Sequence, residues 1–379
     1  MSFDLIKQLI DKNFAEGLPE AQIIIHKDGK EVFRHIAGFS DAEKTKPAQY
    51  SDLFWLFSMT KVFTMTAAMR LVERGVLNLD EPIGTYLESF QKLTVKAGEG
   101  TEPLKNPLTL RRLMSMTGGY GYIVNDYSGV IRVCENKKAS TAEIVDAFSE
   151  TPLNFQPGTH FSYSFCHDIV AGIVEAVSGK TYGEFLKDEL FTPLGITDMG
   201  FKWSEEQIKK RAAKWKCERT GEKISFSVGS QLNWLELSEN YESGGAGLFG
   251  NAEQYIKLAD ALANGGVAYN GYRVLSVDSI ELMRTNQLSE QALKEFQSQP
   301  RFKGYGYGLG VRTVIDNAAA NISPNCHEFG WDGAAGSYVL IDPENHISIV
   351  YAQHIMGHDE APTKYHHAFR DLTYKALGL

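Results

Sequence analysis

Apolar residues at helical spacing mark the start of the chain. They recur at positions 3, 5, 6, 9, 10 and 14, with charged or polar residues between them, which predicts an amphipathic helix. Residues 21–27 and 31–37 are apolar-rich and flank Asp28-Gly29. An Asp-Gly pair between two such segments predicts a β-hairpin with a tight turn.

Later apolar patterns predict helices in the middle of the chain and strands near its end. Residues 58–74 fit a helix closed by Gly75, since glycine commonly follows the last helical residue. Loops rich in Gly, Pro, Asn and Ser separate the helical segments between residues 76 and 245. Further helices are predicted over residues 141–148, 168–177, 252–263 and 362–377, and strands over residues 337–341 and 346–352.

This order of elements predicts an α+β fold. Strands from both ends of the chain would form one antiparallel sheet flanked by helices, with a mostly helical domain inserted in the middle. We expect residues 1–75 and 246–379 to form the domain that contains the sheet and residues 76–245 to form the inserted domain. The active site would then lie between the two.

Composition and charge exclude several classes of protein. The 379 residues are 43% hydrophobic and 22% charged, with a formal net charge of −9, which argues against a general nucleic-acid binder. The chain has no run of about 18 apolar residues that would predict a membrane span. Charged residues interrupt its N-terminal apolar residues, unlike those of a signal peptide. The four cysteines, Cys134, Cys166, Cys217 and Cys326, match no metal or redox spacing, so we expect reduced thiols and a cytoplasmic location.

Glycine-rich and histidine-rich patterns elsewhere do not predict a cofactor. Residues 245–250 fit G-x-G-x-x-G, but loop-like residues precede them where a dinucleotide site needs a strand. The glycines of residues 304–310 are expected to permit close backbone packing beside exposed aromatic side chains. His354 and His358 have H-x-x-x-H spacing, yet a glycine separates them and H-E-x-x-H is absent. We expect these two, His366 and His367 to be surface histidines, and no metal site.

The stretch FSMTK, residues 57–61, has the form S-x-x-K. Residues three apart share a helix face, so the Ser58 hydroxyl and the Lys61 amine can meet. A hydroxyl becomes a good nucleophile when a neighbouring base takes its proton, and a lysine can be that base where burial favours its neutral amine. Ser89 and Lys92 repeat the pattern in a polar segment. On the pattern alone, Ser58 can be either a nucleophile or an N-terminal helix cap.

Longer stretches resemble the serine β-lactamase and penicillin-binding-protein superfamily. FSMTKVFTMTAAMRLVERGVLNLDEPIGTYL resembles its first catalytic motif, and PGTHFSYSFCHDIVAGIVEAVSGKTYGEFLKDELFTPLGITDMGF resembles its second motif region. LTLRRLMSMTGGYGY resembles the segment that lines the site, and GWDGAAGSYVLIDPENHISIVYAQH resembles part of the last third. The order of these segments is most similar to class C β-lactamases and family VIII carboxylesterases. The resemblance implies a β-lactamase/DD-peptidase-like fold.

The resemblance also implies roles for individual residues. Ser58 would be the nucleophile, Lys61 its proton partner, and Tyr163 a general base that later acts as an acid. Residues 331–333, Trp-Asp-Gly, replace the Lys-Thr-Gly motif of the β-lactamases. The main-chain N–H groups of Ser58 and Ala334 would form the oxyanion hole. The substrate would contact Trp331, Asp332, Gly333, Phe165, Tyr120 and Tyr122.

These roles predict a serine hydrolase that forms an acyl-enzyme on Ser58 without a cofactor. Trp331 stands where a lysine would attract a substrate carboxylate, and Asp332 can add a negative charge, so the sequence favours small neutral esters over β-lactams. Phe165 stands where the family's asparagine would bind the substrate amide, which also favours esters. If Asp332 only caps a turn and Phe165 only packs in the core, the replacement of the lysine by Trp331 still favours esters. The enzymatic alternative is a β-lactamase or D-amino-acid peptidase, which acts on amides. A non-catalytic penicillin-binding-like module is the third hypothesis.

Overall fold

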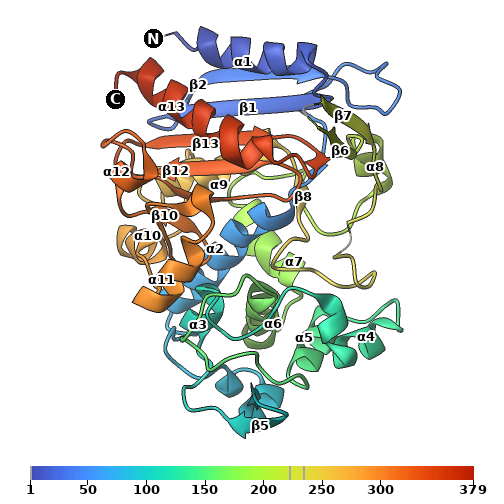
Figure 1. The fold of residues 1–379 in the computed structure, drawn as a ribbon, viewed down its shortest axis with the longest axis vertical. Helices are drawn as coiled ribbons and strands as arrows, with labels where there is room; N and C mark the ends of the chain where they lie inside the picture. The colour runs from blue at the N-terminus through green and yellow to red at the C-terminus, as the bar shows by residue number, and fades with distance from the viewer. Residues whose placement is uncertain (1, 222, 234) are drawn as a thin grey trace.

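A seven-stranded antiparallel sheet forms the upper part of the molecule (Figure 1). The computed structural model describes residues 2–221, 223–233 and 235–379. Across the sheet the order is β2-β1-β13-β12-β11-β10-β9, and β1 pairs with β13 with Ile24 opposite Val350. Both ends of the chain therefore build one sheet. Its strands are β1 (Glu20–Lys27), β2 (Lys30–Gly38), β9 (Tyr305–Tyr307), β10 (Arg312–Val314), β11 (Phe329–Asp332), β12 (Tyr338–Asp342) and β13 (Ile347–Ala352).

Helices cover both faces of this sheet. Successive residues of a strand point to opposite faces, and in β1 Ile23 and Ile25 pack into one apolar cluster while Ile24 packs into another. The first cluster includes residues of the N-terminal helix α1 (Asp4–Ala15) and the C-terminal helix α13 (His366–Leu377). On the other face, α9 (Ala252–Ala263) packs against β1, β12 and β13.

The helix α2 (Thr60–Glu73) lies below the sheet in the middle of the molecule (Figure 1). Every residue from Thr60 to Leu71 is buried, and the polar side chains among them, Thr60, Lys61, Thr64, Thr66 and Arg70, are hydrogen-bonded, as burial of polar groups requires. It packs against α6 (Cys166–Ser178), α7 (Tyr182–Leu186) and α10 (Val277–Arg284). Its first turn is thereby held between the sheet and the lower helices.

The remaining elements are short. Figure 1 shows α3 to α6 and the hairpin β4–β5 in the lower part of the molecule, and β6–β7 beside the sheet, where β6 pairs with β14. The helices are α3 (Leu110–Met114), α4 (Ser128–Cys134), α5 (Thr141–Phe148), α8 (Glu205–Lys209), α11 (Glu290–Phe296) and α12 (Asn317–Ala320). The strands are β3 (Phe54–Trp55), β4 (Thr94–Ala97), β5 (Gly100–Pro103), β6 (Trp215–Thr220), β7 (Lys223–Val228), β8 (Phe249–Gly250) and β14 (Ile355–Met356). Single helical turns of other types span Phe57–Met59, Ile83–Thr85, Glu88–Lys92, Val124–Asp126, Lys187–Phe191, Pro300–Phe302 and Ala361–Tyr365.

The predicted α+β fold and its main elements are confirmed. The hairpin turn at Asp28-Gly29 has positive φ at both residues, which explains the preference for this pair. The helix predicted from residue 58 begins at Thr60, after a 3₁₀ turn. The division into a sheet domain and an inserted domain stays a prediction.

Two expectations about exposure are wrong. Tyr305 and Tyr307 are buried rather than exposed. Their strand β9 is at the edge of the sheet, but α11 packs against it and covers it. His354, His358 and His366 are also buried, whereas His367 is half-buried. Each of the three buried rings packs against another aromatic ring, so they belong to the core.

Candidate active site

Ser58 lies in the 3₁₀ turn that precedes α2. The segment before it is fixed because β3 pairs with β8 and the Leu56 N–H donates to the Leu248 carbonyl at 2.9 Å. Phe57 has a φ of +48°, which is uncommon for a side chain of this size. Backbone strain of this kind clusters at functional sites, where the surrounding contacts hold it in place.

Lys61 lies one turn after Ser58 and is fully buried. Its Nζ donates to Ser58 Oγ at 3.3 Å and to the Gly245 carbonyl at 2.7 Å. The Nζ is also 4.6 Å from the centre of the Tyr163 ring. A buried amine without partners would be costly, so these contacts both stabilise Lys61 and aim it at the Ser58 hydroxyl.

Tyr163 approaches Ser58 from the other side. Its hydroxyl donates to Ser58 Oγ at 2.7 Å and accepts from the indole N–H of Trp331 at 3.1 Å. The Tyr163 and Trp331 rings are also stacked, with centres 5.7 Å apart. Trp331 therefore orients the phenol and supplies a donor to its oxygen, an interaction that becomes stronger when that oxygen carries negative charge.

A second phenol, Tyr122, packs beside this group. Its ring centre is 5.2 Å from that of Tyr163 and 5.7 Å from Lys61 Nζ. Burial, and then the proximity of Tyr163 and Asp168, raise the pKa of Tyr122 well above its ordinary value, although a hydrogen bond with Ser58 opposes this. Tyr122 is therefore held as a neutral phenol, unsuited to accept a proton.

Residues 331–333, which stand in place of the third catalytic motif Lys-Thr-Gly, bring the end of β11 against Ser58. The Gly333 N–H donates to the Ser337 carbonyl at 2.8 Å and forms a tight turn. A Cβ on Gly333 would lie 2.5 Å from the Leu56 carbonyl oxygen, so only glycine permits this approach. Ser58, Gly333 and Ala334 border the same pocket, which supports the expected oxyanion hole without testing it.

The pocket above Ser58 has a volume of about 280 Å³ and is rich in aromatic side chains. Phe302 stacks on Phe296 with ring centres 4.3 Å apart and on Trp331 at 5.8 Å, so a column of rings forms one wall. The lining residues are Phe57, Ser58, Tyr122, Phe161, Tyr163, Leu235, Ala246, Phe296, Gln299, Arg301, Phe302, Trp331, Asp332, Gly333 and Ala334. A small apolar ester group fits such a lining.

Asp332 borders the pocket, but its charge is matched by neighbouring arginines. Its carboxylate accepts from buried Arg312 at 2.6 Å and lies 3.9 Å from Arg301. Although burial opposes ionisation, Arg312 holds the pKa of Asp332 below its ordinary value. His366 is 3.8 Å away and stays neutral at pH 7, because burial lowers its pKa to about 4. The free negative charge that the sequence suggested is not found here.

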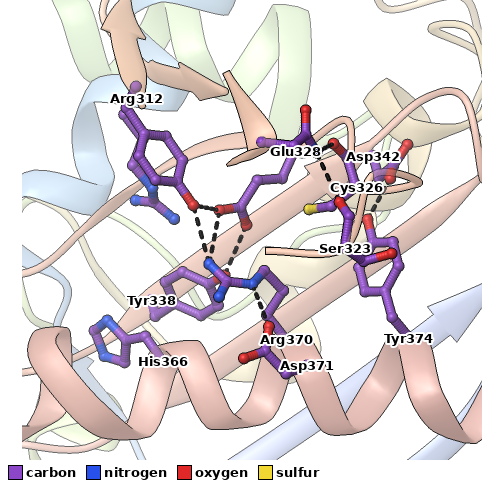
Figure 2. Close-up of polar contacts among 12 residues, drawn as sticks. Arg312, Ser323, Cys326, Glu328, Tyr338, Asp342, His366, Arg370, Asp371 and Tyr374 are labelled. Atoms are coloured by element: carbon purple, nitrogen blue, oxygen red, sulfur yellow. Dashed lines mark hydrogen bonds and ion pairs between the residues drawn. The ribbon is translucent and has the colours of Figure 1, made fainter. Parts of the chain in front are cut away.

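A second buried ion pair supports β11 from behind (Figure 2). Arg370 rises from α13 toward the carboxylate of Glu328, 3.5 Å away, and also bonds Asp371. Glu328 accepts from the hydroxyl groups of Tyr305 and Tyr338 at 2.5 and 3.0 Å. Although burial opposes ionisation, Arg370 helps to hold the pKa of Glu328 below its ordinary value. These satisfied contacts fix the strand that ends in the third motif.

The loop that holds Lys61 has its own anchor. Asp168 in the first turn of α6 is buried and accepts from Tyr241 at 2.6 Å, Ser243 at 2.5 Å and the Gly245 N–H at 3.3 Å. A Cβ on Gly245 would lie 2.5 Å from the Asp168 carboxylate. The segment is thus pulled close to α6, and this places the Gly245 carbonyl on Lys61.

Most of the predicted site residues come together, but two lie elsewhere. Phe165 and Tyr120 are buried in an aromatic core around Phe148 and do not line the pocket. Phe165 touches Tyr122, with ring centres 4.8 Å apart, so it supports the site from behind. The second S-x-x-K serine, Ser89, donates to Asp146 at 2.6 Å rather than facing a lysine.

Sequence reasoning missed much of the pocket wall. Gln299, Arg301 and Phe302 lie between α11 and β9, and Phe161 and Leu235 come from loops. No motif or spacing marks these residues, because loops far apart in the sequence bring them together. Phe161, two residues before Tyr163, is the one that proximity to a motif could have indicated.

Within the described ranges, no group of three or more His, Cys, Asp or Glu side chains is placed to hold a metal ion. Among the described helices, none combines the length and the apolar character that crossing a membrane requires.

Comparison with known proteins places this geometry in context. A sequence model of the Beta-lactamase family matches residues 4–371. Protein Rv1367c of Mycobacterium tuberculosis is 28% identical over 83% of this chain and 80% of its own length. Esterase EstB of Burkholderia gladioli is 26% identical over 90% of this chain and 88% of its own length.

A solved structure has the same fold. EstCE1, described as a hydrolase with promiscuous acyltransferase activity, superposes with a TM-score of 0.80 at 22% identity. The match covers 97% of each chain. At this identity the likeness is evidence for the fold, and the chemistry has to be argued from the site.

Proposed function

Since the chain belongs to the Beta-lactamase family, we propose that it is a serine esterase that acylates Ser58. The observation that carries the proposal is the double contact on Ser58 Oγ, from Tyr163 at 2.7 Å and from Lys61 at 3.3 Å. A hydroxyl placed between two groups that can exchange protons has the arrangement of an activated nucleophile. The name of Esterase EstB, a relative of similar length, supports the same reaction class.

The geometry supports a two-step reaction. In acylation, Ser58 Oγ attacks the ester carbonyl carbon and its proton passes to the Tyr163 oxygen, which must be a phenolate at that moment. Lys61 and the Trp331 N–H both favour that anion. As the C–O bond to the alcohol breaks, Tyr163 returns the proton to the leaving oxygen. In deacylation, water adds to the acyl-enzyme through the same proton transfers in reverse.

The amide N–H groups of Ser58 and Ala334 are the proposed oxyanion hole. During attack the carbonyl oxygen becomes negative, and two main-chain donors would stabilise that charge. Removing one such donor generally lowers kcat by roughly 10²–10³-fold. Gly333 serves the same step, because it permits the turn that brings Ala334 to the pocket.

Trp331 favours esters over β-lactams and peptides as substrates, because it replaces a cationic lysine and its indole binds a catalytic residue. Its indole N–H is committed to Tyr163, so the third motif offers no cation for a β-lactam carboxylate at that position. Among the described lining residues, Gln299 is the only side-chain amide that could bind a substrate amide. A binding module without activity is disfavoured, because Ser58 keeps hydrogen bonds with both Lys61 and Tyr163, the two groups that its activation needs.

The central test uses the two S-x-x-K serines as a matched pair. We expect a fluorophosphonate probe to label the wild type and the Ser89→Ala variant, but not Ser58→Ala. Hydrolysis of 4-nitrophenyl butyrate should follow the same pattern. Equal losses in the two variants, or no adduct on Ser58, would overturn the assignment.

A second measurement separates the two enzymatic hypotheses. The wild type should have a higher kcat/KM for 4-nitrophenyl butyrate than for a chromogenic cephalosporin, in parallel assays on one preparation. Faster turnover of the cephalosporin would identify a β-lactamase instead.

We also place the enzyme in the cytoplasm. The four cysteines are free thiols, which supports a reducing compartment. Cell fractionation followed by immunodetection tests this, and recovery outside the cytoplasmic fraction would contradict it.

A further inference from the structure

One basic side chain borders the proposed ester pocket. Arg301 lies in the turn Pro300–Phe302, between α11 and β9. Among the described residues that line the pocket, it is the only lysine or arginine. Its guanidinium carbon is 4.4 Å from the centre of the Phe302 ring, so the aromatic wall holds it at the rim. About 33% of its side chain is exposed, so solutes can reach it.

The charge of Arg301 is only loosely matched. Its nearest anionic partner is Asp332, at 3.9 Å. That carboxylate is already bound by Arg312 at 2.6 Å, and the Arg312 side chain is only 6% exposed. Two guanidinium groups therefore face one carboxylate. His366 adds no positive charge at pH 7, and Glu328 behind it is matched by Arg370.

The surroundings of Arg301 define what it can bind. The rings of Phe296, Phe302 and Trp331 form an apolar wall beside it, and Gln299 adds a neutral donor two residues away. The pocket thus combines the acylation site, an apolar body and one cationic end. A guanidinium at such a place recognises planar anions through two parallel hydrogen bonds.

We propose that Arg301, assisted by Gln299, is an anion subsite and that the substrate is an ester that carries a carboxylate. This inference rests on the proposed esterase function. A carboxylate is favoured over a phosphate, because Arg301 is the one lysine or arginine among the described lining residues and can match a single negative charge, whereas a phosphate group carries nearly two at pH 7. The proposal departs from the neutral esters that the sequence favoured. That expectation rested on the lysine replaced by Trp331 and on a negative charge at Asp332, whereas here Arg301 supplies a cation from another loop and Arg312 binds Asp332.

The test compares two anionic esters with their neutral methyl esters, after subtraction of the uncatalysed rate of each. The first pair is the mono-4-nitrophenyl ester of glutaric acid and its methyl ester, which place the carboxylate on the acyl side. The second pair is 4-(butyryloxy)benzoate and its methyl ester, which place it on the alcohol side. We expect wild-type kcat/KM to favour the anionic member of at least one pair by about tenfold, between the usual effects of an exposed ion pair and a buried charged hydrogen bond. High salt should reduce this preference.

Two variants assign the preference to Arg301. Arg301→Gln should abolish it, so that kcat/KM for the anionic esters falls about tenfold relative to kcat/KM for their neutral partners. Lys303→Gln removes the same charge from an exposed residue that does not line the pocket, and it should leave the preference unchanged.

The outcomes that overturn the subsite differ from those that overturn the esterase. Wild-type rates that are equal, or higher for the neutral member of both pairs, would refute the subsite while ester hydrolysis continues. An equal loss on charged and neutral esters in Arg301→Gln would also refute it, since Arg301 would then only shape the pocket. No hydrolysis of any of the four esters would refute the esterase itself.

Discussion

Two phenols, Tyr163 and Tyr122, lie near Ser58, and their surroundings determine which of them can accept its proton. Tyr163 donates to Ser58 Oγ and accepts from the Trp331 N–H. For Tyr122, burial raises the pKa well above the ordinary value, which keeps it a neutral phenol. The Trp331 N–H is instead placed to stabilise negative charge that develops on the Tyr163 oxygen during the reaction. Tyr163 is therefore the better proton acceptor.

Replacing each phenol by phenylalanine tests this division. Tyr163→Phe should lower kcat by roughly 10²–10⁴-fold, the usual contribution of a general base. Tyr122→Phe removes one hydrogen bond and should lower kcat by no more than about tenfold. Steady-state kinetics with 4-nitrophenyl butyrate gives both values. If Tyr122→Phe lost more kcat than Tyr163→Phe, Tyr122 would be the general base instead of Tyr163.

At the scale of single residues, the sequence could predict the chemical group but not the pocket. The contact between Ser58 and Lys61 was predictable because i,i+3 spacing allows two side chains to share a helix face, but the spacing alone did not distinguish a nucleophile from a helix cap. Tyr163 and Trp331 required a family resemblance, since no local rule brings them to Ser58. Arg301 and Phe302 were not predictable, because their position depends on how a loop folds over the pocket.

At the scale of elements, the segment 241–245 connects α6 to α2. Asp168 on α6 accepts three hydrogen bonds from this segment, and the Gly245 carbonyl accepts from Lys61 on α2. Burial raises the pKa of Asp168, although Ser243, Tyr241 and Lys61 favour its ionised form. Asp168 therefore acts as a positioning residue through the segment that it holds, and its carboxylate also interacts electrostatically with Lys61.

Asp168→Asn should weaken both the fold and the reaction. Loss of charged hydrogen bonds generally costs about 1–3 kcal/mol of unfolding free energy, measurable by urea denaturation. Because the Gly245 carbonyl would shift from Lys61, kcat should also fall, by about tenfold, while KM changes little. Ser89→Ala, which loses one surface contact with Asp146, is the control. An unchanged kcat well below the unfolding temperature would show that the segment does not position Lys61.

Long elements with clear periodicity were predictable from sequence. Helices α5 and α9 have the predicted bounds, and β13 begins one residue later than expected. Short strands such as β3, β8 and β14 were not predicted, since two residues give no periodic signal. The buried histidines were missed for a related reason. Their partners lie in distant segments, so nothing local distinguishes them from surface histidines.

At the scale of the whole molecule, joining both chain ends in one sheet encloses some carboxylates. Glu20 begins β1, and Asp52 lies in the loop before β3. Both are buried, and Asp52 accepts from the Gln49 N–H at 2.6 Å. Burial raises the pKa of Asp52 to about 6, and burial together with Asp52 raises the pKa of Glu20 well above its ordinary value.

This pair makes the stability of the fold depend on pH. Because the folded-state pKa of Asp52 exceeds its unfolded value of 3.8, the folded state binds more protons between these values. The contribution of Asp52 is therefore fully favourable below about pH 4 and is lost as the pH rises through about 6. Asp52→Asn removes the charge, so it should raise the unfolding free energy at pH 8 by about 1–3 kcal/mol and by progressively less toward pH 4. Urea denaturation across this range, with Glu43→Gln from the same loop as an exposed control, measures the difference. A variant less stable than wild type at pH 8 would show that the Gln49 contact outweighs the cost of burying the charge.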